Sequence, residues 1–133
     1  MDDHKLFAGV CACIRETLEK DLPDIRDSDR LIKDLGADSL DFLDLIFRLE
    51  KTFSVRVNPR DLERRTQERL GDAPMLVDGR YTAAAVEEFR KAMPEVPPDE
   101  LFPDMPAAKL AESFRVRTFM NLVSYARGDG GTA

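Results

Sequence analysis

Apolar residues recur at three- and four-residue steps along two long stretches of the chain, which is the spacing of one face of an α-helix. The first stretch ends near Lys20, ahead of a helix-breaking run at residues 21–24. The second extends from about Asp38 to Thr52. The positions expected to face a core are Leu6, Phe7, Val10, Cys13 or Ile14, and Leu18 in the first stretch, and Leu43, Ile46, Leu49 and Phe53 in the second.

The later part of the chain predicts shorter elements. Helix periodicity, turn residues and prolines indicate, in order, a helix over 60–70, a tiny hairpin around Asp78-Gly79, a helix over 83–93 capped by Thr82, a proline-rich loop over 95–106, helical turns in 107–113, and a last helix capped by Thr118. Because helical patterns dominate throughout, we expect an all-α fold.

Charge and composition narrow the function classes. The 133 residues suit one small domain or one domain with an insertion, and 20 basic against 26 acidic residues give a net charge of −6. This acidic balance argues against nucleic acid as a partner and favours partner proteins with basic surfaces. No apolar run is long enough to cross a membrane and no signal-peptide pattern is present, so we expect a soluble cytoplasmic protein.

The two cysteines, Cys11 and Cys13, do not indicate a disulfide or a metal site. Two positions apart on a helix, their side chains point in different directions. No second pair of cysteines or histidines completes a zinc site, and the acidic residues of the loop at 21–37 lack the ligand spacing of a calcium loop. We expect no metal.

One serine has a distinctive position. Gly36 interrupts the chain and Asp38 stands where a helix N-cap is expected, so Ser39 would be the first or second residue of the helix behind it. The positive end of the helix dipole favours a negatively charged group such as a phosphodiester. A catalytic serine is disfavoured, because the glycines of a nucleophile elbow are missing and His4 is the only histidine. Ser39 is therefore interpreted as a tether, with Leu40 anchoring the turn.

Asp38-Ser39-Leu40, preceded by Asp34-Leu35-Gly36 and followed by Asp41-Phe42-Leu43-Asp44-Leu45, resembles the prosthetic-group site of acyl carrier proteins. The resemblance implies an all-α, acyl-carrier-type four-helix bundle with an additional mainly helical insertion. It implies a covalent 4′-phosphopantetheine on Ser39, flanked by Asp38 and Leu40, and a carrier rather than an enzyme. The expected organisation is a carrier domain at 1–59 and 114–127, a helical insertion at 60–113 packed on it, and a disordered tail at 128–133.

The resemblance also implies partners. A phosphopantetheinyl transferase would modify Ser39, and acyl-ACP synthetase, ketoacyl synthase and acyltransferase-type enzymes would act on the acyl thioester of a monomeric carrier. Asp41, Asp44 and Glu50 would form an acidic docking strip for basic patches on these enzymes. The residues that would line an acyl pocket, each equally explained as plain core, are Leu43, Ile46, Phe47 and Phe53.

The enlarged region before the last helix resembles specialised carriers of long acyl chains, such as those of lipid A synthesis. In this region Met75, Leu76, Phe89, Met93 and Phe102 are expected to pack on the carrier core. Two alternatives stay open. The first is a peptidyl or aminoacyl carrier of a polyketide or nonribosomal pathway, and the second is an unmodified interaction protein with the carrier fold.

Overall fold

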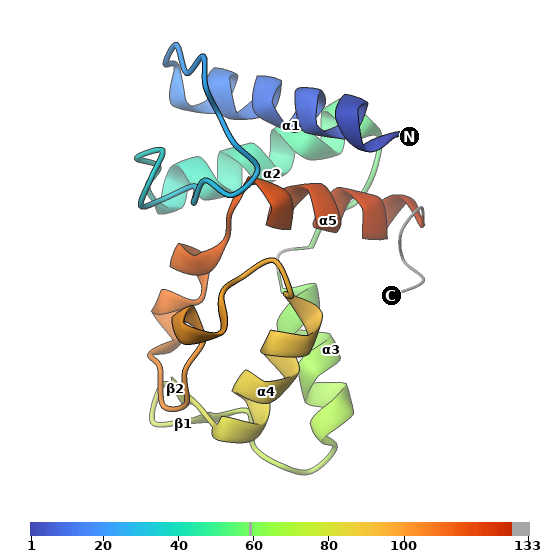
Figure 1. The fold of residues 1–133 in the computed structure, drawn as a ribbon. Helices are drawn as coiled ribbons and strands as arrows, with labels where there is room; N and C mark the ends of the chain where they lie inside the picture. Colours follow the sequence, from blue (N-terminus) through green and yellow to red (C-terminus); the bar gives the residue numbers. More distant parts are fainter. Residues whose placement is uncertain (59, 129–133) are drawn as a thin grey trace. The chain divides into compact units, whose positions relative to one another are not determined.

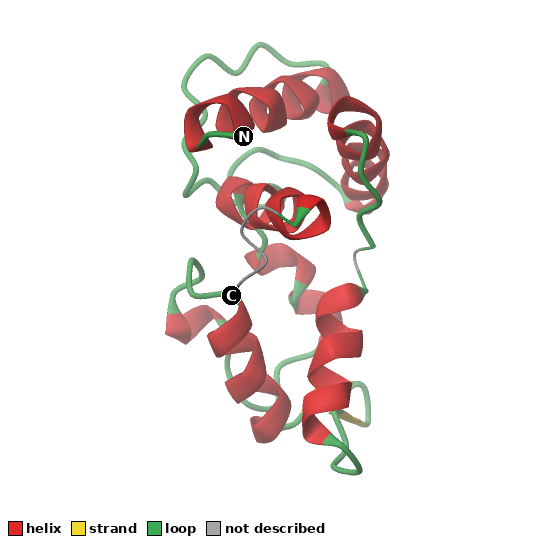
Figure 2. Ribbon diagram, turned by 90° about the vertical axis from the view of Figure 1, so that its right-hand side faces the viewer, coloured by secondary structure: helices red, strands yellow, loops and turns green. Residues whose placement is uncertain are grey.

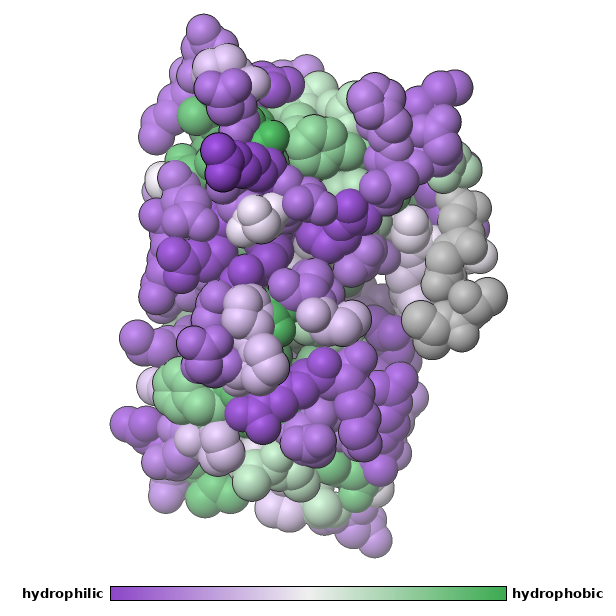
Figure 3. All heavy atoms as spheres, viewed as in Figure 1, coloured by the Kyte–Doolittle hydropathy of each residue, from purple (hydrophilic) through white to green (hydrophobic). Residues whose placement is uncertain are grey.

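The computed structural model describes residues 1–58 and 60–128 and is built almost entirely from helices (Figure 1). The prediction of an all-α fold with an additional mainly helical region is confirmed. The chain forms two compact units: unit 1 comprises Met1–Val57 and Phe114–Ala133, and unit 2 comprises Asn58–Ser113. On the face drawn in Figure 3, hydrophilic side chains surround small separate apolar areas.

Three helices form unit 1: α1 (Asp3–Leu18), α2 (Ser39–Phe53) and α5 (Val116–Arg127). Helix α1 packs against both α2 and α5. The described part of unit 1 therefore has one α-helix fewer than the four-helix bundle implied by the resemblance. Its fully buried apolar side chains come from all three helices and the loop before α2, and they include Val10, Ile14, Leu31, Leu45, Leu49, Val116, Phe119, Met120 and Val123.

A close helix–helix contact explains the glycine in the middle of α1. A Cβ built on Gly9 would lie 2.6 Å from the ring atom Cζ of Phe53, so the ring occupies the space that a larger residue would need. Glycine inside a helix costs about 1 kcal/mol relative to alanine. The close approach of α2 to α1 offsets that cost, and it places Phe53 in the core between these helices.

The long loop before α2 is ordered by hydrogen bonds to the start of α5. The Leu31 amide donates to the Phe114 carbonyl at 3.0 Å. In the other direction, the Val116 amide donates to the backbone carbonyl of Asp29 at 2.9 Å, and the Arg117 amide donates to that of Asp27 at 2.8 Å. Because of this pairing α5 begins at Val116, with Arg115 at its N-cap. Thr118 lies inside the helix, where its hydroxyl accepts from the Arg115 amide, so its prediction as the cap is wrong.

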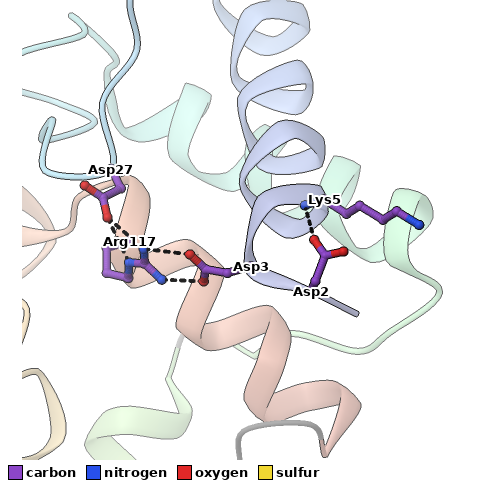
Figure 4. A network of polar contacts seen from close by, with 5 residues as sticks. All are labelled: Asp2, Asp3, Lys5, Asp27 and Arg117. Atoms are coloured by element: carbon purple, nitrogen blue, oxygen red, sulfur yellow. Dashed lines mark hydrogen bonds and ion pairs between the residues drawn. The ribbon is translucent and has the colours of Figure 1, made fainter.

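An arginine ties three segments of unit 1 together (Figure 4). The Arg117 guanidinium donates to both carboxylate oxygens of Asp3, at 2.7 and 3.2 Å, and to Asp27 at 2.8 Å. The hydrogen bond from Arg117 is the largest contribution that lowers the pKa of Asp3. Beside it, the Asp2 carboxylate accepts from the Lys5 amide and caps α1. These contacts hold the start of α1 and the long loop against α5.

Unit 2 is assembled from short elements (Figure 2). Helices α3 (Asp61–Leu70) and α4 (Ala83–Ala92) pack together, and β1 (Leu76–Val77) pairs with β2 (Arg80–Tyr81) through the predicted Asp78-Gly79 turn. Three short 3₁₀-helices follow, η1 (Pro98–Glu100), η2 (Ala107–Lys109) and η3 (Ala111–Ser113). In the core the Tyr81 and Phe89 rings meet edge to face at 4.7 Å, and burial raises the pKa of Tyr81 to about 12.

The residues of this region that were expected to pack on the carrier core divide into two groups. Phe89 and Met93 are buried, whereas Leu76 and Phe102 are exposed and Met75 is half-buried. Phe89 contacts Tyr81 of its own unit. The packing of 60–113 on the carrier domain stays a prediction.

Three further expectations concern the cysteines, the membrane and the tail. Cys11 and Cys13 are free and buried, and burial raises the pKa of both thiols, so the prediction that they do not bridge is confirmed. Over residues 1–58 and 60–128, no helix has the length and apolarity to span a membrane, and no cluster of metal-ligating side chains is found. The predicted disordered tail falls, apart from Gly128, outside the described residues.

Candidate functional site

A glycine turn delivers the chain to α2. Gly36 has φ +83°, in the left-handed region that glycine adopts without strain, and its amide donates to the Ile32 carbonyl at 3.1 Å. The next amide, of Ala37, donates to Leu31. The Lys20 ammonium lies over this turn, 3.1 Å from the position that a Cβ would take on Gly36. The turn therefore has a fixed conformation and a cation beside it.

Asp38 and Asp41 cap the helix reciprocally. The Asp41 amide donates to the Asp38 carboxylate at 2.9 Å, and the Asp38 amide donates to the Asp41 carboxylate at 3.0 Å. This arrangement satisfies two of the amides that a helix N-terminus leaves without partners. Asp38 thus performs the capping that a serine in this region could otherwise have performed.

Ser39 is the first residue of α2 and is exposed. In the described part of the chain its hydroxyl makes no side-chain hydrogen bond. A phosphodiester on this oxygen would lie at the positive end of the α2 dipole. The acidic neighbours Asp38 and Asp41 are held by their capping contacts, and Lys20 supplies a positive charge near the turn. The residues present fit a phosphate-linked prosthetic group on Ser39.

Helix α2 has apolar side chains on two faces. Leu40, Leu43 and Phe47 form an exposed row, hereafter the outer strip, with exposed fractions of 76%, 51% and 64%. The expectations that Leu43 faces the core and that Leu40 anchors the turn are therefore wrong. The buried face comprises Phe42, Leu45, Ile46, Leu49 and Phe53.

The four predicted acyl-pocket residues do not share one surface. Ile46 and Phe53 are buried, whereas Leu43 and Phe47 belong to the outer strip. Two hollows, of about 360 and 730 Å³, lie on unit 2, and none of the four residues lines either hollow. As the lining of an acyl pocket these residues stay a prediction.

The predicted acidic docking residues all have contacts within the chain. Asp41 belongs to the cap, and the Asp44 carboxylate pairs with Arg48 at 3.0 Å. The Glu50 carboxylate accepts from the Val57 amide at 3.0 Å and so fixes the chain after α2. Arg48 also pairs with Glu16 of α1 at 3.1 Å. Arg48 was not among the residues predicted from the sequence, although its four-residue spacing from Asp44 is a signal for such a pair.

An aromatic group beneath the start of α2 was also missed. The Phe42 ring lies 5.5 Å from that of Phe114 and 5.4 Å from that of Phe119, and the last two rings lie 5.8 Å apart. Phe42 follows Ser39 by three positions, and the other two rings come from the chain that returns after unit 2. We call these residues the phenylalanine triad.

Comparison with known proteins relates this geometry to a family. The phosphopantetheine attachment site family matches residues 8–73. An acyl carrier protein of Thermotoga maritima is 42% identical over 60 residues, which are 45% of this chain and 74% of that protein. Acyl carrier proteins AcpXL of Mesorhizobium japonicum and Rhizobium meliloti are each 44% identical over 62 residues, 47% of this chain.

The extent of these matches differs between the relatives. The chain spans 63% and 62% of the length of the two AcpXL proteins, which is less than two thirds of each. No solved structure matches the chain significantly.

Proposed function

The chain belongs to the acyl carrier protein family, and within that frame we propose that Ser39 is its attachment residue. The family's prosthetic group is a covalently bound 4′-phosphopantetheine, and the protein is a carrier rather than an enzyme. One observation carries the assignment. Asp38 and Asp41 complete the helix cap between themselves, so the exposed Ser39 hydroxyl is not required for capping.

The attachment chemistry requires an accessible hydroxyl and an environment that accepts a phosphodiester. A separate phosphopantetheinyl transferase would catalyse attack of the Ser39 oxygen on the pantetheine-bearing phosphorus of coenzyme A. The new O–P bond forms as the pyrophosphate bond breaks, adenosine 3′,5′-bisphosphate leaves, and the hydroxyl proton passes to a base of the transferase. Exposure of Ser39, the α2 dipole and the Lys20 ammonium beside the Gly36 turn support this role.

The proposed cargo is an acyl chain held as a thioester for fatty-acid or specialised lipid synthesis. The similarity to AcpXL proteins favours a specialised carrier. We propose that acyl-ACP synthetase, ketoacyl synthase and acyltransferase-type enzymes are partners of a monomeric cytoplasmic protein. The outer strip offers them an apolar contact beside Ser39. Residues 60–113 would be an insertion that adapts the carrier to its own partners or cargo.

The intact mass of the protein tests the attachment site. Wild type and Ser39→Ala are incubated with coenzyme A and a broad-specificity phosphopantetheinyl transferase. Wild type should gain one phosphopantetheine and Ser39→Ala none. A gain in both proteins would assign the site to another serine, and a gain in neither would favour the unmodified interaction protein. The acyl group found on protein from its own host would then separate an acyl carrier from an aminoacyl or peptidyl carrier.

A further inference from the structure

A hollow of about 360 Å³ opens on unit 2 between the hairpin, the start of α4 and the chain segment 103–104. We call it the hairpin hollow. Its volume lies at the lower end of the range for small-molecule sites, so it has room for one or two side chains. Apolar side chains border it. Val77 lines it and is 52% exposed, and Phe102, next to the lining residue Pro103, is 42% exposed.

Hydrogen bonds on both sides of β2 fix the walls of the hairpin hollow. On one side β1 pairs with β2, and the Thr82 amide donates to the Met75 carbonyl at 3.0 Å. On the other side the returning chain lies along β2 (Figure 1). There the Tyr81 amide donates to the Met105 carbonyl at 3.0 Å, and the Asp104 amide donates to the Tyr81 carbonyl at 2.9 Å. A partner bound here would therefore not have to order the surface that it meets.

Two carboxylates at the hairpin hollow have no partner in the described part of the chain. Asp78 and Asp104 both line the hollow and are exposed, and over residues 1–58 and 60–128 neither side chain makes a hydrogen bond or an ion pair. Arg80 also lines the hollow, but its guanidinium donates to the backbone carbonyl of Asp104 at 3.0 Å. The carboxylates thus outnumber the guanidinium. Residues 94–106, which supply part of the wall, contain four acidic residues and no lysine or arginine.

The acidic residues of α2 differ in this respect. Asp41, Asp44 and Glu50 are each engaged by a hydrogen bond or an ion pair within unit 1. Asp78 and Asp104 are instead available to a positively charged group from outside. A purely apolar surface that covered them would remove their hydration without compensation. The hairpin hollow therefore fits a partner that presents a positive charge beside an apolar group.

We propose that the hairpin hollow is a docking site for a partner protein, and that it receives an arginine side chain flanked by an apolar residue. The guanidinium would bind the Asp78 and Asp104 carboxylates, since its N–H donors can serve two carboxylates at once. The apolar residue would cover Val77 and Phe102 and remove them from water. The proposal goes beyond acyl carriage and is independent of Ser39, because unit 2 supplies every group that it requires.

The test follows binding of a minimal probe to the full chain by NMR. Acetyl-leucyl-arginine amide is titrated into the isotopically labelled protein, and the shifts of the backbone amides are recorded. Acetyl-leucyl-citrulline amide, which has nearly the same shape without the charge, is the matched probe.

Three variants are compared with wild type: Asp78→Asn, Asp104→Asn and Asp99→Asn. Asp99 is exposed in the same unit but does not line the hairpin hollow, so its substitution controls for the loss of one negative charge. Asp78 has φ +54° and Asp104 has φ +71°. Asparagine tolerates this left-handed region as aspartate does, so the substitutions preserve the fold.

The expected result is saturable binding of the arginine probe, with shifts centred on the amides around the hairpin hollow. The citrulline probe should bind about fivefold more weakly, because it cannot pair with the carboxylates. Asp78→Asn and Asp104→Asn should each weaken binding of the arginine probe about threefold, whereas Asp99→Asn should change it less than about 1.5-fold. Added salt should weaken binding to wild type, because it screens exposed charges.

Several results would overturn the proposal. Absence of saturable shifts around the hollow, or equal binding of the two probes, would show that the carboxylates do not select a positive charge. An equal effect of Asp99→Asn would reduce the interaction to general attraction by an acidic protein. Equal binding of acetyl-glycyl-arginine amide would indicate a site for a small cation. Shifts of the same amides on raising the protein concentration alone would identify a second copy of the chain as the occupant.

The probes bind the unmodified chain, so none of these results depends on phosphopantetheine loading. Failure of the docking proposal and failure of Ser39 as the attachment residue are therefore distinguished by separate measurements.

Discussion

The two units of this chain are both helical and both have aromatic contacts in their cores, but they expose apolar residues in different chemical settings. Unit 1 exposes the outer strip of α2 directly after Ser39, a serine that no capping contact requires. Unit 2 exposes Leu76 and Val77 of its hairpin, together with Phe102. An exposed apolar row becomes evidence for function when a reactive group with a suitable electrostatic environment lies beside it.

The boundary between the units also differs from the boundary of the family match. Similarity to the phosphopantetheine attachment site family continues to residue 73, beyond the end of α3. The compact unit 1 ends at Val57 and is completed by the chain from Phe114 onward. A continuous match in sequence therefore does not identify the residues that complete a compact unit.

The largest expected effect tests whether the two cores are separate. Phe119→Ala should lower the free energy of unfolding of unit 1 by about 3–5 kcal/mol, and Phe89→Ala should do the same in unit 2, because each removes a completely buried ring. Hydrogen exchange resolved by residue is the measurement. Each substitution should accelerate exchange mainly in its own unit, and equal acceleration in both units would mean that they unfold together.

A smaller effect is expected from removal of the two helix caps, one in each unit. Asp38→Ala in unit 1 and Thr82→Ala in unit 2 should each lower the free energy of unfolding by about 1 kcal/mol. Each of these side chains accepts a hydrogen bond from an amide of the first turn of its helix. Chemical denaturation measures both. Only Asp38→Ala should also slow phosphopantetheine loading, since it disorders the turn that presents Ser39. Slower loading in Thr82→Ala would count against the proposed separation of roles.

The smallest effect concerns the ionic contacts of Arg117. Arg117→Ala should lower the free energy of unfolding by about 0.5–1 kcal/mol at pH 7, because both partner carboxylates are substantially exposed. The folded-state pKa of Asp3 is lowered, so its stabilising contribution is present above the unfolded pKa of about 4 and is lost as the pH falls through the folded value.

Chemical denaturation of wild type and Arg117→Ala at pH 7 and at about pH 3 tests whether the contribution of Asp3 to stability is lost on acidification. The difference in free energy of unfolding between wild type and Arg117→Ala should be smaller at the lower pH. Lys5→Ala, which removes a positive charge near the same end of α1, is the control and should show a smaller difference at pH 7. A difference in free energy of unfolding that becomes larger at the lower pH would contradict the assigned role of Asp3.

Local chemistry in the sequence was sufficient to predict the serine turn. Gly36 as a chain break, Asp38 as the cap and Ser39 as the first or second helical residue all depend on neighbours within a few positions, and the structure agrees with each, with Ser39 as the first. The Asp78-Gly79 hairpin and the Thr82 cap were predictable for the same reason. Short-range hydrogen bonds and backbone preferences act over the distance at which a sequence pattern can be read.

The faces of α2 could not be predicted in this way. Leu40, Leu43 and Phe47 follow the same three- and four-residue spacing as the buried residues from Phe42 to Phe53, so periodicity fits both faces. Contacts with α1 and the returning chain decide which face is buried. The contacts of Phe42 with Phe114 and of Arg117 with Asp3 join residues more than seventy positions apart. Tertiary packing decides such pairs, because they gain free energy only after the chain has brought distant segments together.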